Sequence, residues 1–235
     1  MNLILLQKED LIAPNLARVS PRQEKHIRKV HRAECGKTLR VGLENGKIGS
    51  GKILSMEKGD LRLQVEWNEE PPEPSPIRLI LAMPRPKALK RIIQDITTLG
   101  VKELHIIKTW RVEKSYWSSP ALKKESLEEQ IRLGLEQGRD TIFPTITVHP
   151  YFKPFVEDEL PAISKGSRCL VAHPKTQKKA PYHVDQPVTL VIGPEGGFIE
   201  YEIEKFQELG FEIVSLGDRI MRVETAISVL IGRLT

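Results

Sequence analysis

The chain has 235 residues, of which 40% are hydrophobic, and its formal net charge is +5. This length is enough for one large domain or two modest ones with a real core. The N-terminal segment lacks the basic region and cleavage site of a signal peptide, and no apolar run approaches the length of a membrane span, so we expect a cytoplasmic protein without a membrane partner. Cys35 and Cys169 are the only cysteines and lack the paired spacing of a zinc site, so we expect neither a disulfide framework nor a metal.

The first seventy residues predict a small β-rich unit with one basic helix. Ser20 and Pro21 are typical of a helix N-terminus, and the helix is expected to extend to about Arg32. Two alternating runs flank Asn45-Gly46, a dipeptide suited to the positive backbone angles of a tight hairpin, and LRLQVEW supplies another strand. The basic residues of this region indicate either a nucleic-acid contact or an ordinary solvated face.

The acidic, proline-rich segment EEPPEPSP, residues 69–76, is the clearest interruption in the chain. We place the domain boundary there, with a first domain over 1–70 and a second over 77–235. In the second domain strands and helices alternate, and runs such as LILAM and LVIG are apolar without alternation, as in strands covered on both faces. The pattern predicts an α/β fold with a mostly parallel sheet and helices on both faces.

The elements expected in the second domain follow in chain order. Strands are predicted in IRLILAMP, ELHIIKT, IFPTITV, RCLVAH, VTLVIGP and FEIVSLG. Helices are predicted in PKALKRIIQDITTLG with Gly100 as its end, from Ser119-Pro120 to about Gly138, in EYEIEKFQELG with Gly210 as its end, and in RVETAISVLIGRL.

Three loops at predicted strand ends have the composition of a binding site, because open parallel sheets bind ligands beyond the carboxyl ends of their strands. VIGPEGGF, residues 191–198, carries three glycines that allow backbone to approach a ligand closely. The others are SLGDRIMRVETA, residues 215–226, and VAHPKTQKKA, residues 171–180. The glycine loop lacks the Lys-Ser/Thr of a P-loop and the dinucleotide-binding spacing, so a nucleotide-phosphate site is disfavoured, and a purely structural turn is the alternative.

IGPEGGF followed by LGDRIMRVETA resembles the two signature loops of the RsmE-type family, which methylates N3 of a uridine in 16S (small-subunit) ribosomal RNA and belongs to the SPOUT methyltransferases. HIRKVHRAECGKTLRVG resembles the start of that family's PUA-like RNA-binding domain, and LVAHP its third cofactor loop. The resemblance implies a C-terminal SPOUT domain with a trefoil knot, preceded by a small β-rich PUA-like domain. The sequence departs from the family pattern at Thr98, at Arg139 and in TWRVEKSY, on the side expected to face RNA.

The resemblance further implies S-adenosylmethionine as the cofactor, small-subunit ribosomal RNA as the partner, and a homodimer. The residues that it assigns to the cofactor are Ala172, His173, Ile192, Gly193, Pro194, Glu195, Gly196, Gly197, Leu216, Gly217, Ile220, Met221 and Thr225. His173 is equally compatible with a structural histidine at a strand end.

Arg222 and Glu224 are the candidate catalytic residues. Uracil N3 is a poor nucleophile until it loses its proton, and a fixed cation would stabilise the anion that spreads onto the carbonyl oxygens. Arg222 is the expected cation, and Glu224, whose ionised form is favoured at a helix N-terminus, would orient it. The alternative is an ordinary ion pair that caps the helix. The expected RNA-binding residues are Arg28, Arg32 and Lys37 in the first domain, and Lys175, Lys178 and Lys179 beside the cofactor loop.

Three other functions fit parts of this pattern. A relative that methylates a ribose 2′-hydroxyl would share the fold but lack the PUA-like start. A non-catalytic RNA-binding pseudoenzyme would retain the basic domain, although the intact GPEGG and RIMRVETA loops argue against it. A nucleotide-binding metabolic enzyme is disfavoured because no phosphate-binding motif is present.

Overall fold

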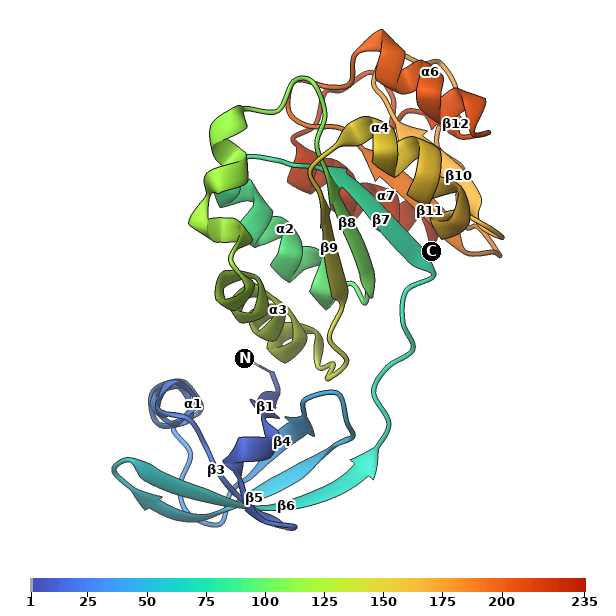
Figure 1. Ribbon diagram of the computed structural model, residues 1–235. Helices are drawn as coiled ribbons and strands as arrows, with labels where there is room; N and C mark the ends of the chain where they lie inside the picture. The colour runs from blue at the N-terminus through green and yellow to red at the C-terminus, as the bar shows by residue number, and fades with distance from the viewer. Residues whose placement is uncertain (1) are drawn as a thin grey trace. The chain divides into compact units, whose positions relative to one another are not determined.

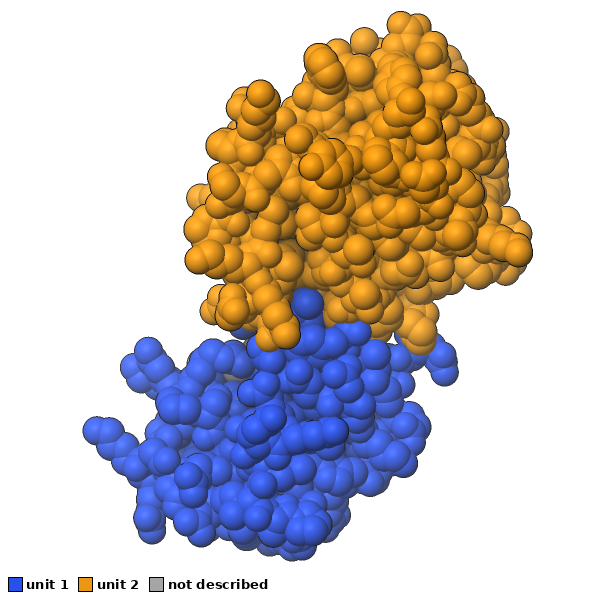
Figure 2. All heavy atoms as spheres, viewed as in Figure 1, with its two compact units in different colours: residues 1–73, 131–143 blue, residues 74–130, 144–235 orange. Residues whose placement is uncertain are grey.

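The computed structural model describes residues 2–235, which form two compact units (Figures 1 and 2). Unit 1 comprises Met1–Glu73 and Ile131–Phe143, and unit 2 comprises Pro74–Gln130 and Pro144–Thr235. The chain therefore enters unit 1 twice. That the ranges 1–70 and 77–235 act as separate functional domains stays a prediction. None of the helices described here combines the length and the apolar character that crossing a membrane requires.

Unit 1 is built on a six-stranded sheet with the order β1-β4-β5-β6-β3-β2. Neighbouring strands are antiparallel except for β1 and β4, which pair in parallel. The hairpin predicted at Asn45-Gly46 is confirmed as the β4–β5 connection, although only Asn45 has a positive φ, 55°. The strands are β1 Ile4–Leu6, β2 Leu11–Ala13, β3 Leu16–Arg18, β4 Thr38–Leu43, β5 Ile48–Glu57 and β6 Asp60–Glu69, with the short η1 turn Lys8–Asp10 after β1.

The basic helix α1, Pro21–His26, buries the polar side chains of Gln23 and Glu24, and it begins as predicted. The Ser20 hydroxyl accepts a hydrogen bond from the backbone N–H of Gln23, and Pro21 is the first helical residue. The helix continues as one wider turn, η2 Ile27–His31, and ends at Arg32 in a left-handed conformation. Ile27 is fully buried in the core of unit 1.

The second passage of the chain through unit 1 is held by a buried carboxylate. Both Nη atoms of Arg22 donate to the Glu136 carboxylate, which is 2% exposed. The backbone N–H of Asn45 donates to the Thr141 carbonyl at 2.8 Å, which ties the same segment to the β4–β5 turn. Arg139, one of the departures from the family pattern, has φ 58° directly after α3, Lys124–Gly138.

Unit 2 contains a six-stranded sheet in which every neighbouring pair is parallel, in the order β12-β10-β11-β7-β8-β9. The predicted parallel α/β sheet is therefore confirmed. All carboxyl ends lie at one edge of the sheet. The strands are β7 Ile77–Ala82, β8 Glu103–Ile107, β9 Thr145–His149, β10 Arg168–Ala172, β11 Val188–Ile192 and β12 Glu212–Val214.

Helices cover both faces of this sheet (Figure 1). On one face α2, Pro86–Thr98, contacts α7, Val223–Leu234. On the other face an aromatic core that includes Phe155, Phe198 and Phe206 packs on Ile80 and Val191. Besides the strands, residues of this core come from the glycine loop and from the helical segments α4 Phe152–Pro154, η5 Phe155–Glu159, α5 Leu160–Ile163 and α6 Glu200–Glu208.

One helical prediction for unit 2 was wrong, and one helical segment was missed. The helix predicted from Ser119 begins instead at Lys124, because Lys123 is extended with ψ 141°. Ser119 caps only the short η4 turn, Pro120–Leu122, where its hydroxyl accepts from the Ala121 N–H at 3.2 Å, and a second turn, η3 Lys114–Ser118, precedes it. The helical segments over 152–163 were not predicted.

A row of hydrogen-bonded polar side chains joins β8 to β9 next to Phe155 of the aromatic core. His105 Nδ1 lies 2.9 Å from His149 Nε2, and His105 Nε2 lies 2.8 Å from the Glu103 carboxylate. His149 Nδ1 lies 3.2 Å from Glu159 at the outer end. Both histidines are buried, and the Phe155 ring lies 4.4 Å from the His149 ring. Burial lowers the pKa of His149, although the negative charge of Glu159 opposes this effect.

We predict that the free energy of unfolding decreases as pH falls from about 7 to about 5. Because the pKa of His149 is lowered in the folded protein, the unfolded chain binds the proton more readily below about pH 6.5, and folding loses stability there. Urea unfolding at several pH values measures this slope. His149→Gln keeps a hydrogen-bonding side chain that does not titrate, so its slope should be shallower; equal slopes would contradict the assignment to His149.

Candidate active site

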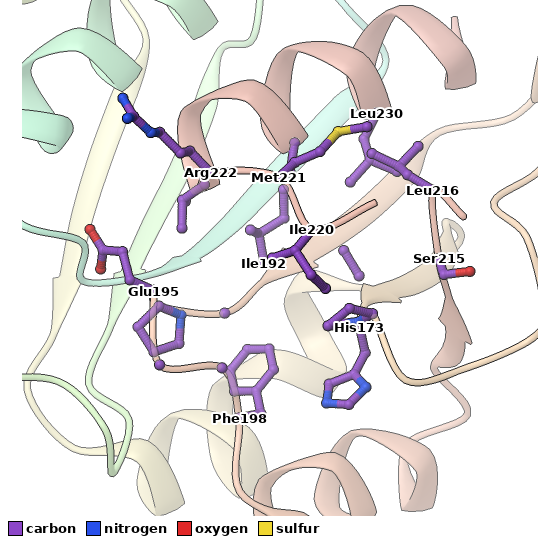
Figure 3. A pocket seen from close by; sticks show the side chains of 18 of the residues that line it. His173, Ile192, Glu195, Phe198, Ser215, Leu216, Ile220, Met221, Arg222 and Leu230 are labelled. Carbon is purple, nitrogen blue, oxygen red and sulfur yellow. The ribbon is translucent and has the colours of Figure 1, made fainter. Parts of the chain in front are cut away.

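The carboxyl edge of the parallel sheet in unit 2 opens onto a cavity of about 1290 Å³ (Figure 3). Residues from the loops after β7, β8, β10, β11 and β12 line it, so the parallel register brings together segments more than 100 residues apart. The carboxyl edge of such a sheet is the usual place for a small-molecule site, and this cavity is large for one small ligand alone.

The glycine loop after β11 is fixed from two directions. The Glu195 carboxylate accepts a hydrogen bond at 3.1 Å from the backbone N–H of Arg85, at the start of α2. On the other side Arg111 Nη1 donates to the Gly196 carbonyl at 2.8 Å. Gly197 has φ 70°, and its N–H donates to the Pro194 carbonyl at 2.8 Å, which closes a tight turn. The loop therefore presents a preorganised backbone to the cavity.

The loop after β12 supplies an apolar wall. Gly217 has φ 110°, a conformation that a residue with a side chain rarely adopts. In Figure 3 the side chain of Met221 extends toward Leu230 of α7. Ile220 also lines the cavity and is 80% exposed, so a large apolar side chain faces open space there. The apolar wall consists of Ile192, Leu216, Ile220, Met221 and Leu230.

His173, after β10, is a half-buried histidine on the cavity wall. Its Nδ1 accepts a hydrogen bond at 3.2 Å from the backbone N–H of Lys175, so the proton of the neutral ring lies on Nε2. Burial, together with the positive charges of Lys175 and Arg111, lowers the pKa of His173. The ring is therefore a neutral donor at pH 7. Ala172 and Lys175 line the same side of the cavity.

Arg222 and Glu224 both line the cavity, at the N-terminus of α7. Arg222 is exposed and Glu224 is half-buried. Within the part of the chain that the structure describes, no ion pair joins the two side chains, so the helix-capping pair considered from the sequence is not formed. The idea that Glu224 orients Arg222 likewise has no direct contact to support it. Thr225 is exposed and is not among the residues that line the cavity.

A group of cations on the cavity wall was missed in the sequence. Arg85, Lys87 and Arg91 come from the start of α2, and Arg111 comes from the loop after β8. The segment PRPKALKR directly follows a predicted strand, so the rule that singled out the other loops would have found it too. Arg111 lies in TWRVEKSY, the segment that matches the family pattern only loosely. We call Arg85, Lys87, Arg91 and Arg111 the cationic group.

The RNA-binding residues predicted in unit 1 differ in their exposure, and Arg28 is half-buried. Arg28 is occupied within the unit: its Nε is 2.8 Å from Glu24, and its Nη2 donates to the carbonyls of Met56 and Glu57. Arg32 and Lys37 are exposed. Among the lysines near the cofactor loop, Lys178 pairs with Glu212 on β12 and thereby lowers the pKa of that carboxyl.

Sequence comparison relates most of the chain to RNA methyltransferases. A family model described as an RNA methyltransferase domain matches residues 71–235. The ribosomal RNA small subunit methyltransferase E of Treponema pallidum is 29% identical over 96% of this chain and 87% of its own length. The protein of the same name from Bacillus subtilis is 27% identical over 86% and 82% of the two chains.

Solved structures show the same fold. The ribosomal RNA small subunit methyltransferase E of Neisseria gonorrhoeae, bound to S-adenosyl methionine, has a TM-score of 0.77 at 19% identity and covers 97% of this chain and 95% of its own. A Legionella pneumophila protein in complex with the bound cofactor SAM has a TM-score of 0.71 at 25% identity, with 98% and 96% coverage. The predicted α/β fold class and the resemblance to the RsmE-type family are thus confirmed, and the chain belongs to the RNA methyltransferase domain family.

Proposed function

We propose that the protein transfers the methyl group of S-adenosylmethionine to N3 of a uridine in small-subunit ribosomal RNA. The observation that carries this proposal is the meeting of three features at one cavity: a fixed glycine loop, an apolar wall and the exposed cation Arg222. The names of the curated relatives support a ribosomal RNA substrate. The choice of uridine N3 rests on the family resemblance.

The residues of the cavity suit S-adenosylmethionine. Gly193 to Gly197 offer backbone polar groups, the apolar wall suits the adenine ring, and the Nε2–H of His173 offers one donor. When bound, the cofactor would supply an electrophilic methyl group on a sulfonium. The trefoil knot around this site stays part of the proposal.

The residues of this chain would then align the acceptor and stabilise its anion. In-line displacement demands that the acceptor nitrogen be held close to the methyl group and that water be excluded. Loss of the N3 proton places negative charge on the flanking carbonyl oxygens of uracil, and the Arg222 guanidinium, which has no ion-pair partner among residues 2–235, would stabilise that charge. Glu224 faces the same cavity and is available to hold the departing proton.

RNA would be held by its phosphates. The cationic group and Lys175 surround the cavity, and Arg32 and Lys37 are exposed in unit 1. Such contacts position the backbone without reading sequence. The target base must leave its stack to enter a pocket, which costs about a few kcal/mol. A homodimer and a cytoplasmic location remain part of the proposal.

The first experiment titrates the protein calorimetrically with S-adenosylmethionine, ATP and NAD. We expect saturable binding of the methyl donor alone. Small ribosomal subunits from cells that lack the protein are then incubated with protein and donor, and the nucleosides are separated chromatographically. The expected product is 3-methyluridine; a 2′-O-methylated nucleoside would assign the other SPOUT chemistry, and RNA binding without donor binding would indicate a pseudoenzyme.

Gly217→Ala should weaken donor binding about tenfold, because a side chain at φ 110° costs about 1–3 kcal/mol unless the loop shifts. The calorimetric Kd of S-adenosylmethionine measures the effect. Gly210→Ala is the matched control: Gly210 has φ 82° at the end of α6 but does not line the cavity. The control should lose stability and keep donor affinity. Equal donor affinity in both variants would contradict a role of the β12 loop.

Arg222→Ala should lower kcat about 100-fold or more, the loss typical of removing one group that stabilises a developing anion. The Kd of the donor should change less than about twofold, since among residues 2–235 no hydrogen bond or ion pair joins the guanidinium to the glycine loop or to the β12 loop. Arg222→Lys keeps the charge and should recover part of the rate. Loss of donor affinity with kcat retained would instead assign Arg222 to the cofactor.

A further inference from the structure

Trp110 is a large aromatic side chain that the proposed mechanism leaves unused. It is 80% exposed, whereas tryptophan is among the residues most often buried at least in part. It belongs to the turn after β8, in which the Val112 N–H bonds to the Thr109 carbonyl. Folding of the chain gains little from an indole in this position, so its exposure calls for another explanation.

The backbone around Trp110 is rigidly attached to the active-site loops. The N–H of Trp110 donates at 2.7 Å to the Glu202 carboxylate, which is 2% exposed and also accepts from the Ile199 N–H at 3.0 Å. The next residue, Arg111, lines the cavity and bonds to the Gly196 carbonyl. Glu200 and Glu204, on either side of Glu202 along α6, line the cavity as well. Trp110 is therefore held beside the cavity, at its rim.

We propose that Trp110 is a stacking platform for a nucleobase of the RNA strand that delivers the target uridine. The inference rests on the proposed function, and it adds a residue that recognises single-stranded RNA. Every base has a π-face, so stacking on an exposed aromatic ring holds an unstacked strand regardless of sequence. Because the backbone of the turn is already fixed, the protein would lose little conformational entropy when a base stacks on Trp110, since only the side-chain torsions of the indole become restricted.

The charge near Trp110 favours RNA over a protein partner. Lys108, Arg111 and Lys114 lie within four residues of it in the sequence, where Glu113 is the one carboxylate. Helix α6 adds Glu200 and Glu204 on the cavity wall and Glu202, whose buried carboxylate already accepts the N–H groups of Trp110 and Ile199. The fully buried centre of a protein interface is depleted of charge, whereas sites for single strands combine cations that track phosphates with aromatic rings that stack on bases. The turn after β8 has this second composition.

The test measures binding of a single-stranded oligouridylate and of small-subunit ribosomal RNA to the donor-loaded protein. Trp110→Ala should raise the Kd for both RNAs about tenfold, the order expected for one lost stack. Trp110→Phe keeps an aromatic ring and should recover most of the affinity. Donor Kd and kcat at saturating RNA should stay within about twofold of wild type. Oligouridylate should also quench tryptophan fluorescence in the wild type and much less in Trp110→Phe.

Tyr182→Ala is the matched control. Tyr182 is 73% exposed and stacks on Arg233 near the end of α7, and neither residue lines the cavity. Its removal deletes an exposed aromatic ring that has no link to the turn after β8, and RNA affinity should not change.

Three results would overturn the inference. Unchanged RNA affinity in Trp110→Ala would show that the indole does not stack. A weaker donor Kd would show that it supports the glycine loop instead, and a change of oligomeric mass by light scattering would assign it to a protein contact. If the wild type methylates RNA and Trp110→Ala binds RNA with the same Kd, the stacking role is wrong and the proposed function stands. If the wild type neither binds the donor nor methylates RNA, the proposed function itself is wrong.

Discussion

The parallel pairing of all six strands in unit 2 is the constraint on which the site depends. β11 lies between β10 and β7 in the sheet, so the loops that follow these strands emerge at one edge although they lie far apart in the sequence. The aromatic core on one face and the contact of α2 with α7 on the other keep this sheet in place. Disruption of either layer would displace several walls of the cavity at once.

Glu202 shows how the loops are then joined to one another. Its buried carboxylate accepts two backbone N–H groups, one from its own helix start and one from the turn after β8. Burial raises the pKa of Glu202, although these two hydrogen bonds act in the opposite direction. Together with the hydrogen bonds from Arg111 to Gly196 and from Arg85 to Glu195, this interaction links the loops after β7, β8 and β11. A displacement of one of these loops would therefore displace the others.

The features that the sequence predicted are those with a local signal. Ser20-Pro21 caps a helix, Gly100 and Gly210 end helices with positive φ, and apolar runs without alternation became buried parallel strands. The glycine loop could be recognised in part because Gly197 has φ 70°, a conformation that favours glycine whatever lies around it.

The features that were missed depend on distant contacts or on competing local signals. Arg111 meets Gly196 across 85 positions, and no local pattern encodes that contact. Arg28 looks available in the sequence, but it is held by carbonyl groups of a strand that follows 28 residues later. Pro154 and Pro161 interrupt the segment 152–163, which hid its short helical turns.

The double passage of the chain through unit 1 has a consequence for its synthesis. Residues up to Glu73 leave the ribosome first, yet unit 1 also contains Ile131–Phe143, whose Glu136 pairs with Arg22 and whose Thr141 bonds to Asn45. The N-terminal sheet can therefore complete its packing only after the chain has been translated through Phe143, 70 residues beyond Glu73. Folding of the two units is interleaved in time, and a truncation at the proline-rich segment would leave the N-terminal fragment without Ile131–Phe143.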